Sequence, residues 1–441
     1  LTIDWNDVVD AKKLNYIIGN PPFLGKKEQS VKQKADLRLT AKNVSGIGNL
    51  DYVTAWYFKA ADYIQLNHQI KVAFVSTNSI SQGEQAAVLW KNIYNKVSPM
   101  FAYPTFKWDS DAADKAAVHC VIIGFTSKLN ICSKRYIFIN NEKQEVKSIG
   151  PYLNDGDMIF VESRTTPIFP NAPTMSYGSM PIDNKHFSLS KVDVELLLKE
   201  NPSNKRFIKK YIGGLELLKS VEKWCLWLQD ATPSDITRSK FIKNRVMKVK
   251  EFRSSSNRLQ TIKLADTPHL FGEIRQPQSK MLVFPKVSSE SRPYLPSSFV
   301  EPTTIVSGSA LFIPDANLYH FGILSSSVHM AWMRMVCGRL ENRYQYSKDI
   351  VYNNFPWPNC PEVLQNEIQD TAQAILEARK LYPQCSLAEL YDKDNLTLYR
   401  ALSIAHEAND KAVKKAYNFS SNLSEHEIIT ELMKLYSKIN S

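Results

Sequence analysis

The fold is decided by one short stretch near the start of the chain, Tyr16-Ile17-Ile18-Gly19-Asn20-Pro21-Pro22-Phe23. The apolar run over residues 14–18 predicts a buried strand that ends at Gly19. The two prolines then exclude the next residues from a sheet ladder and from a helix interior. A stiff turn at the carboxyl end of a strand is the place where open α/β sheets bind their ligands.

The side chains of this turn suit an amino group on a planar ring. The Asn20 amide accepts and donates hydrogen bonds, the carbonyl groups beside Pro21 and Pro22 only accept them, and Phe23 offers a flat face. An exocyclic amino group could lie in plane with the acceptors while its ring stacks on Phe23. A match of four residues also permits a proline-bounded strand end that has no chemistry.

Alternating elements in the first 150 residues predict a mostly parallel α/β sheet. Besides the strand at 14–18, we expect strands at 71–77 and 118–125 and helices at 51–63 and 82–94. No Gly-x-Gly turn follows a strand upstream of Asn20. Such a turn normally lets backbone N–H groups approach a cofactor in this class of sheet.

Length and composition limit the class of protein. A chain of 441 residues predicts two or three domains, and its net charge of +11 fits a polyanionic partner, either nucleic acid or a membrane surface. No apolar run reaches the length of a membrane span. The six cysteines are scattered without a Cys-x-x-Cys pair, which argues against a zinc site and for a reducing, cytoplasmic location.

Proline and glycine positions suggest where the domains end. Asn154-Asp155-Gly156 and the proline-spaced segment after it predict a linker, while Pro356 and Pro358 stop regular structure. We therefore predict domains at 1–154, 155–358 and 359–441, the last of them helical. His406 and Asp410 lie four apart on one predicted helix, and we interpret them as surface polar residues rather than metal ligands.

The most basic part of the chain lies in the second predicted domain. Lys243, Val246, Met247 and Lys250 recur at helical spacing, which predicts one cationic helix face, and residues 254–257 add hydroxyl and amide groups. DNA phosphates favour this combination, although an ordinary solvated helix carries similar charge. The predicted DNA-binding cations of this segment are Lys243, Arg245, Lys248, Lys250, Arg253 and Arg258.

A second candidate for DNA recognition follows at Glu290 and Arg292. In an extended loop, side chains two residues apart point the same way. Arginine binds guanine O6 and N7, and glutamate accepts from cytosine N4, so the pair suits one G·C base pair. A surface salt bridge explains the same two residues equally well. Arg275 and Lys286 are weaker candidates for DNA contacts.

Several motifs in sequence order carry a resemblance to a known family. They are Asn-Pro-Pro-Phe-Leu-Gly at 20–25, Gly-Asn-Leu-Asp-Tyr-Val-Thr-Ala-Trp-Tyr at 48–57, Trp-Cys-Leu-Trp-Leu at 224–228, Pro-His-Leu-Phe-Gly-Glu-Ile-Arg-Gln-Pro at 268–277, Pro-Lys-Val-Ser-Ser-Glu at 285–290 and Asn-Asn-Phe-Pro-Trp-Pro at 353–358. Together they resemble the MmeI-like type IIG (IIL) restriction–modification enzymes, which join a nuclease, a gamma-class adenine-N6 methyltransferase and a target-recognition domain in one chain.

The resemblance implies a fold and a set of site residues. The fold would be the C-terminal half of a Rossmann-like sheet of an S-adenosylmethionine-dependent methyltransferase, then an α+β target-recognition domain and a small helical tail. A flipped adenine would donate its N6 hydrogens to Asn20 and to the Pro21 carbonyl, with Pro22 completing the turn and Phe23 stacking on the base. The remaining implied residues are Phe106 or Trp108 for the opposite stacking wall, and Asp4 together with Asn20 for the cofactor.

The same resemblance sets expectations for partners and activity. Double-stranded DNA is the expected partner, and the nuclease and the Gly-rich cofactor loop are expected in a remaining N-terminal part of the same polypeptide. The chain by itself is therefore expected to bind the cofactor weakly or not at all and to be inactive, with no metal needed for transfer. Two alternatives stay open, a non-catalytic DNA-specificity module and a protein glutamine amide methyltransferase. For Asp4, at the end of a predicted strand over 1–5, a plain turn residue is the alternative.

Overall fold

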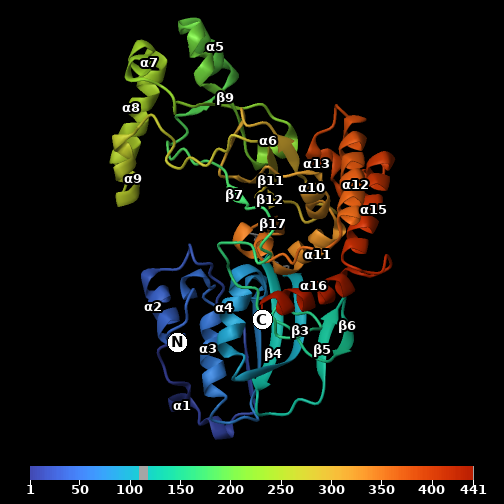
Figure 1. The fold of residues 1–441 in the computed structure, drawn as a ribbon. Coiled ribbons are helices and arrows are strands. Elements are labelled where there is room, and N and C mark those ends of the chain that lie inside the picture. Colours follow the sequence, from blue (N-terminus) through green and yellow to red (C-terminus); the bar gives the residue numbers. More distant parts are fainter. Residues whose placement is uncertain (109–117, 441) are drawn as a thin grey trace. The chain divides into compact units, whose positions relative to one another are not determined.

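The computed structural model describes residues 1–108 and 118–440. Contacts divide the chain into two compact units (Figure 1). The first unit comprises Leu1–Phe169, Trp332–Pro356 and His426–Ser441, and the second comprises Pro170–Ala331 and Trp357–Glu425. Among the described residues, none of the helices combines the length and the apolar character needed to cross a bilayer.

The first unit is built on a mixed sheet, which in the described residues has the order β1-β2-β4-β3-β5-β6. β1 pairs with β2 in parallel, whereas β4 runs antiparallel to both β2 and β3. The predicted α/β class is confirmed, but the sheet is mixed rather than mostly parallel. The strands are β1 (Tyr16–Gly19), β2 (Lys71–Thr77), β3 (Val97–Trp108), β4 (Val118–Ser127), β5 (Arg135–Ile139) and β6 (Glu142–Val146).

Helices pack on this sheet around an aromatic core. Tyr57 contacts the rings of Phe74, Trp90 and Phe125, and its hydroxyl lies 2.8 Å from Ser76 Oγ. The expected helices at 51–63 and 82–94 are present in shorter form as α3 and α4. The helices of this part are α1 (Trp5–Val8), α2 (Val31–Thr40), α3 (Thr54–Tyr63), α4 (Gly83–Ile93) and α16 (Glu425–Asn440), with 3-10 turns η1 (Ala11–Lys13), η2 (Ile47–Asn49) and η3 (Asn78–Ser81).

Two expectations for the amino-terminal segment are wrong. Residues 1–5 form no strand, because Asp4 caps α1 and its carboxylate accepts from Asn6 N at 2.9 Å. β1 is not a buried strand but the edge of the described sheet, with Tyr16 62% and Ile18 79% exposed. Apolar composition predicted the strand, but it does not reveal whether both edges of that strand are covered.

The second unit contains two small sheets with helices around them. Their orders are β14-β9-β10-β8 and β13-β11-β15-β7 in the described residues. The strands are β7 (Ser176–Tyr177), β8 (Ser188–Leu189), β9 (Ile208–Ile212), β10 (Trp224–Leu226), β11 (Met281–Pro285), β12 (Val287–Ser288), β13 (Ser298–Val300), β14 (Ile305–Val306) and β15 (Ala310–Pro314). The first helices are α5 (Lys191–Glu200), α6 (Gly214–Lys219), α7 (Pro233–Arg238), α8 (Lys240–Ser254) and α9 (Leu259–Lys263), with η4 (Pro202–Phe207) and η5 (Leu264–Asp266).

The helical tail packs within the second unit until its last helix. Asn409 on α15 donates to the Gly322 carbonyl of α10 at 2.9 Å and accepts from Thr371 of α12 at 3.1 Å. The chain re-enters the first unit within α11 and again at α16. The helices are α10 (Leu318–Leu324), α11 (Ser327–Val336), α12 (Glu362–Lys380), α13 (Leu387–Leu390), α14 (Lys393–Leu396) and α15 (Arg400–Ala416).

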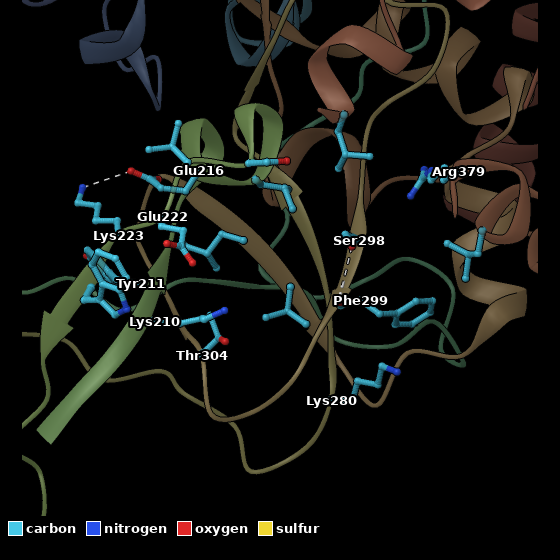
Figure 2. Close-up of a pocket in the computed structure, with 18 of the residues that line it drawn as sticks. Lys210, Tyr211, Glu216, Glu222, Lys223, Lys280, Ser298, Phe299, Thr304 and Arg379 are labelled. Carbon is cyan, nitrogen blue, oxygen red and sulfur yellow. Dashed lines mark hydrogen bonds and ion pairs between the residues drawn. The ribbon is translucent and has the colours of Figure 1, made fainter. Parts of the chain in front are cut away.

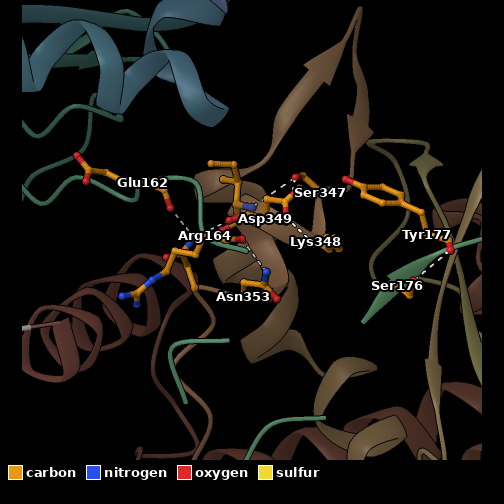
Figure 3. Close-up of polar contacts among 10 residues, drawn as sticks. Glu162, Arg164, Ser176, Tyr177, Ser347, Lys348, Asp349 and Asn353 are labelled. Atoms are coloured by element: carbon orange, nitrogen blue, oxygen red, sulfur yellow. Dashed lines mark hydrogen bonds and ion pairs between the residues drawn. The ribbon is translucent and has the colours of Figure 1, made fainter. Parts of the chain in front are cut away.

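The segment 332–356 of the first unit is hydrogen-bonded to the irregular chain at 162–168. Arg164 N donates to Asp349 O at 2.9 Å, and Asn353 Nδ2 donates to Arg164 O at 2.7 Å (Figure 3). Asn354 Nδ2 adds a bond to Glu162 O at 2.9 Å. The Asn-Asn-Phe-Pro-Trp-Pro motif therefore ties two distant segments together. The elements here are β16 (Gly338–Leu340), β17 (Arg343–Gln345) and the π-helix η6 (Lys348–Tyr352).

Candidate nucleic-acid and methyl-transfer site

The candidate catalytic residues lie at one edge of the first unit's sheet. β1 is parallel to β2, and because β4 is antiparallel to both β2 and β3, β3 runs in the same direction as β2. The carboxyl ends of β1, β2 and β3 therefore lie on the same side of the sheet, which we call the catalytic edge. The register is close there, since Thr77 and Phe106 both face Cys120 of the strand between them. Asn20 follows β1 directly at this edge.

The Asn-Pro-Pro-Phe turn presents its polar residue and anchors its apolar ones. Asn20 and Pro22 are exposed, whereas Pro21 is buried. Phe23 is half-buried and packs against the hydrophobic core of the first unit. This arrangement leaves the Asn20 amide accessible to a ligand and keeps the ring of Phe23 in a fixed place beside it.

Asp51 fixes the turn to the neighbouring strand. Its Oδ1 accepts from Leu24 N at 3.0 Å and from Val53 N at 3.1 Å, and its Oδ2 accepts from Thr77 Oγ1 at 3.3 Å. Burial raises the pKa of this carboxyl, and the hydrogen bonds from Leu24, Val53 and Thr77 oppose that rise. We call residues 20–23 the catalytic turn, after the role expected for them from the sequence. Leu24 comes directly after Phe23, so Asp51 links this turn to the end of β2.

Two glutamine side chains add further hydrogen bonds around Leu24 and Asp51. Gln29 Nε2 donates to Leu24 O at 2.9 Å and to Leu50 O at 3.0 Å. Gln85 Oε1 accepts from Asp51 N at 2.8 Å. Sequence reasoning placed Asp51 at the start of a helix and missed its role. The Gly-Asn-Leu-Asp-Tyr motif could have singled out Asp51 as important. The motif alone, however, does not predict that Asp51 binds the Leu24 and Val53 amides.

The aromatic candidates for the second stacking wall lie on β3. Phe106 and Trp108 share one face of the strand, with ring centroids 6.2 Å apart and planes inclined at 41°. Trp108 is 42% exposed. Phe106 and Thr77 pair with the same residue of β4, so these aromatic residues lie toward the same ends of the strands as Asn20, with β2 and β4 between β1 and β3.

Asp4 lies away from that edge. The aromatic neighbour Trp5 packs edge-on against Tyr63 in the last turn of α3, with centroids 5.6 Å apart. Asp51 and Thr54, by contrast, belong to the start of this helix, and the helix between Thr54 and Tyr63 is about 14 Å long. The assignment of Asp4 to the cofactor is therefore not retained, because the chain preceding β1 runs along α3 to its far end.

Two predicted DNA-binding arginines of α8 are structural. Arg253 is fully buried, and its guanidinium donates to the carbonyls of Pro181, Ile182, Leu264, Thr267 and Leu270 at 2.7–3.1 Å. Arg245 donates to His186 O at 2.8 Å and to Ser188 O at 3.0 Å, and it forms an ion pair with Asp193. Arg253 is buried and Arg245 is held by two carbonyls and a carboxylate, so neither guanidinium is presented to a phosphate, and helical spacing alone does not show these partners.

Of the other predicted DNA-binding cations, some are exposed and others contact neighbouring residues of the second unit. Lys243, Lys248 and Lys250 are exposed on α8, and Arg258 is exposed at the start of α9. Val246, which we placed on the same cationic face, is buried. In addition, Arg275 donates to Gly178 O at 3.1 Å and pairs with Glu273, and Lys286 lies 5.2 Å from the centre of the Tyr177 ring.

Glu290 and Arg292 lie on a turn rather than in an extended loop. Arg292 N donates to Ser289 O at 3.4 Å, and the hydroxyls of Ser289 and Ser291 lie 2.9 Å apart. The alternation argument for the two side chains therefore does not apply. Glu290 is exposed, whereas Arg292 is half-buried and donates to Ser288 Oγ at 3.2 Å. We call residues 289–292 the recognition turn.

His406 and Asp410 are not surface residues. His406 is fully buried, and its Nε2 lies 2.7 Å from Tyr391 Oη. Asp410 Oδ2 accepts from Tyr294 Oη at 2.9 Å, and its Oδ1 accepts from Ser327 N at 2.7 Å. The four-residue spacing was correct for a helix face, but that face is turned toward the rest of the second unit.

A cavity of about 620 Å³ lies in the second unit between β9, α6, β13 and α12 (Figure 2). Several of its charged side chains bind other parts of the second unit. Lys223 lies 3.3 Å from Glu216, Lys280 lies 3.5 Å from Glu301, and Arg379 donates to Ser297 O.

Three family models match the chain in sequence order. The MmeI DNA-methyltransferase domain matches residues 1–139, the MmeI target recognition domain matches 155–359, and the MmeI C-terminal domain matches 361–441. The chain thus combines a domain of the DNA-methyltransferase class with a target recognition domain and a C-terminal domain of the same family. The chain belongs to the MmeI family.

Two relatives support this assignment over the whole chain. "DNA methyltransferase A" of Bacillus subtilis (strain 168) is 36% identical over 442 residues, covering 100% of this chain and 50% of the relative. The solved structure of the type IIL restriction-modification enzyme MmeI in complex with DNA is 41% identical, with a TM-score of 0.93, covering 100% of this chain and 59% of that one. The chain thus spans about half the length of the curated relative it matches.

Proposed function

We propose that this chain is the C-terminal part of a site-specific DNA methyltransferase that modifies adenine N6 in duplex DNA within a restriction–modification system. The observation that carries the proposal is the accessible Asn20, held between a buried proline and the core-packed Phe23 at an edge shared with Phe106 and Trp108. The predicted division into 1–154, 155–358 and 359–441 gives the proposed catalytic, recognition and tail regions.

In the proposed reaction, an adenine leaves the duplex and enters the turn. Its N6 donates hydrogen bonds to the Asn20 side chain and to the Pro21 carbonyl, which increases lone-pair character on the nitrogen. Phe23 stacks on one face of the base, and Phe106 or Trp108 stacks on the other. Asp51 acts as a positioning residue, because it holds Leu24 and therefore the geometry of the whole turn.

S-adenosylmethionine would supply the methyl group. The described residues fit the adenine better than this cofactor, since no glycine-rich turn follows a strand at the catalytic edge in residues 1–108 and 118–440. The chain alone is therefore proposed to bind the cofactor weakly or not at all.

A further part of the same polypeptide would complete the sheet. β1 is the edge strand of the described sheet, and its side chains Tyr16 and Ile18 are largely exposed. An uncovered strand edge carrying apolar side chains favours pairing with another strand. We propose that the missing cofactor-binding strands pair with β1, beside Asn20.

Duplex DNA is the proposed partner of the second unit. The exposed lysines of α8 suit phosphate contacts, which bind any sequence, and the recognition turn suits contacts to base edges. After Arg245 and Arg253 are removed, the phosphate candidates that remain in this segment are Lys243, Lys248 and Lys250 on α8 and Arg258 at the start of α9. Glu290 and Arg292 remain the candidates for base recognition.

The proposal is tested by methyl transfer from labelled cofactor to mixed-sequence DNA. We expect the full-length protein to methylate adenine and residues 1–441 alone to show no detectable incorporation. Robust incorporation by residues 1–441 would show that they already hold the cofactor. Failure of the full-length protein, together with normal DNA binding, would favour a non-catalytic specificity module.

A further inference from the structure

The chain that follows the recognition turn is held at two points by helices 82 to 116 residues further along. The Tyr294 hydroxyl donates to Asp410, and its ring stacks on the His406 imidazole with centroids 4.0 Å apart and planes at 18°. Arg379 Nη1 donates to Ser297 O at 2.7 Å. Residues 294–297 are thus fixed by α12 and α15, which belong to the C-terminal domain of the family.

The side chains of Arg379, Tyr391 and His406 form a chain of hydrogen bonds whose donors and acceptors can be assigned. Arg379 Nε donates to Tyr391 Oη at 3.0 Å, and arginine accepts no hydrogen bonds, so the hydroxyl proton of Tyr391 is left for His406 Nε2. His406 therefore accepts at Nε2 and is neutral, and its complete burial lowers the pKa of the imidazole well below its ordinary value. This neutral ring is the surface on which Tyr294 stacks.

Asp410 restricts the position of the Tyr294 side chain through a hydrogen bond. The carboxylate accepts from the Tyr294 hydroxyl and from the Ser327 backbone, and burial raises its pKa. A buried carboxylate is costly unless donors satisfy its oxygens. The Tyr294 hydroxyl is the donor to Oδ2, so displacement of Tyr294 would remove that hydrogen bond from a carboxylate in a largely buried place.

We propose that Arg379, Tyr391, His406 and Asp410 position the recognition turn for base reading through Tyr294. The C-terminal helices are then part of the specificity apparatus. This inference rests on the proposed function of Glu290 and Arg292. Only Pro293 separates Arg292 from Tyr294, and the fixed φ of proline limits how far the two can move independently. Base discrimination depends on hydrogen-bond geometry, so a small displacement of the turn is sufficient to weaken it.

The test is the base preference of the full-length protein with Tyr294→Phe. This change keeps the ring on His406 and removes the hydroxyl that binds Asp410. Methylation rates are measured on DNA substrates that carry each base pair at each position of the site. We expect discrimination to fall about tenfold at the position read by the recognition turn, within the range that one bidentate contact contributes. Other positions and the salt dependence of binding should not change.

Asp410→Asn provides a graded second variant, since it keeps the shape of the side chain and one acceptor oxygen. We expect a smaller loss of discrimination at the same position. Full loss of preference at every position in both variants would overturn the proposal, because it would indicate general disorder of the second unit.

Two control variants separate positioning from stability. Lys415→Ala removes an exposed ion pair with Glu367 between α15 and α12, at 2.7 Å. Ile375→Val trims a fully buried side chain of α12. Both should retain the parent base preference. If Tyr294→Phe lowers the Tm as Ile375→Val does but keeps the parent preference, the network only stabilises the fold and the inference fails.

A Glu290→Gln, Arg292→Ala double variant tests separately whether the recognition turn reads bases at all, which is the proposed function on which this inference rests. An unchanged preference in the double variant would remove the recognition turn from base reading, and the inference with it. A changed preference in the double variant with an unchanged preference in Tyr294→Phe would overturn the inference alone.

Discussion

The catalytic turn and the recognition turn are held in opposite ways. The residues that fix Leu24 are Gln29 and Asp51, only 5 and 27 positions away, and they belong to the same unit. The chain beyond the recognition turn is fixed by side chains 82 to 116 positions away on other helices. The geometry of the catalytic turn is thus a local property of the sheet. The recognition turn depends on distant helices and can change without disturbing the sheet.

The largest effect is expected from Asn20→Ala in the full-length protein. Losing a positioned group for the reacting amine should lower kcat by about 10²–10³-fold, or about 2–4 kcal/mol. DNA binding should persist, because Leu24 and not Asn20 anchors the turn. Single-turnover methyl transfer and DNA binding are measured on the same preparation, with Glu28→Gln as the control in the same loop. Loss of binding along with turnover would indicate a folding role instead.

Asp51 tests whether the local anchor is essential to the catalytic turn. Asp51→Ala leaves the Leu24 and Val53 amides without their acceptor, at about 1–3 kcal/mol of stability, and should lower kcat as well. Asp51→Asn keeps an oxygen at the Oδ1 position and should be much milder. Denaturant unfolding and methyl transfer are measured for both variants. Equal damage from both would show that the charge matters more than the acceptor.

The same residue gives a pH dependence with a defined sign. Burial raises the pKa of folded Asp51, so its contribution to stability is fully present below the unfolded pKa and is lost as pH rises through the folded value. Asp51→Asn does not titrate. Its stability relative to the parent should therefore improve as the pH rises from below the ordinary aspartate pKa through the raised pKa of folded Asp51. A difference that stays constant over this range would contradict the raised pKa.

Exchange of Glu290 and Arg292 for another compatible pair should change which sequence is modified. Each lost bidentate contact should reduce discrimination by about 1–3 kcal/mol. The measurement is the logo of modified sites in the full-length protein, with methylation of the parent site as the internal reference. An unchanged logo with normal activity would identify the pair as a surface salt bridge. Residues 289–292 would then have no role in recognition, and the comparison with the catalytic turn would no longer apply.

The smallest effect is expected from the exposed lysines of α8. Replacing Lys243, Lys248 or Lys250 by glutamine should weaken binding to all DNA sequences and reduce the salt slope by about one each. Binding is measured over a range of salt concentrations, with Lys380→Gln on α12 as the control. Slopes equal to that of the parent would place the DNA on another surface.

The sequence predicted the elements whose signals are local. The apolar run at 71–77 became β2, and the proline pair placed Asn20 at a strand end. What it missed depends on distant partners. Arg253 is buried because five carbonyls from two other segments surround its guanidinium, and helical periodicity does not show such acceptors. His406 is buried because Tyr391 and Tyr294 cover it, and neither lies near it in sequence.

The interleaving of the two units has a consequence for biosynthesis. The first unit takes its last helix, α16, from residues that leave the ribosome after the whole second unit. Tyr436 of that helix lies 5.7 Å from the Trp332 ring centre and donates to Phe160 O at 3.4 Å. Domains generally fold in the order in which they are synthesised. Here the first unit receives α16 only after the second unit has been synthesised, so the contacts of Tyr436 with Trp332 and Phe160 form late.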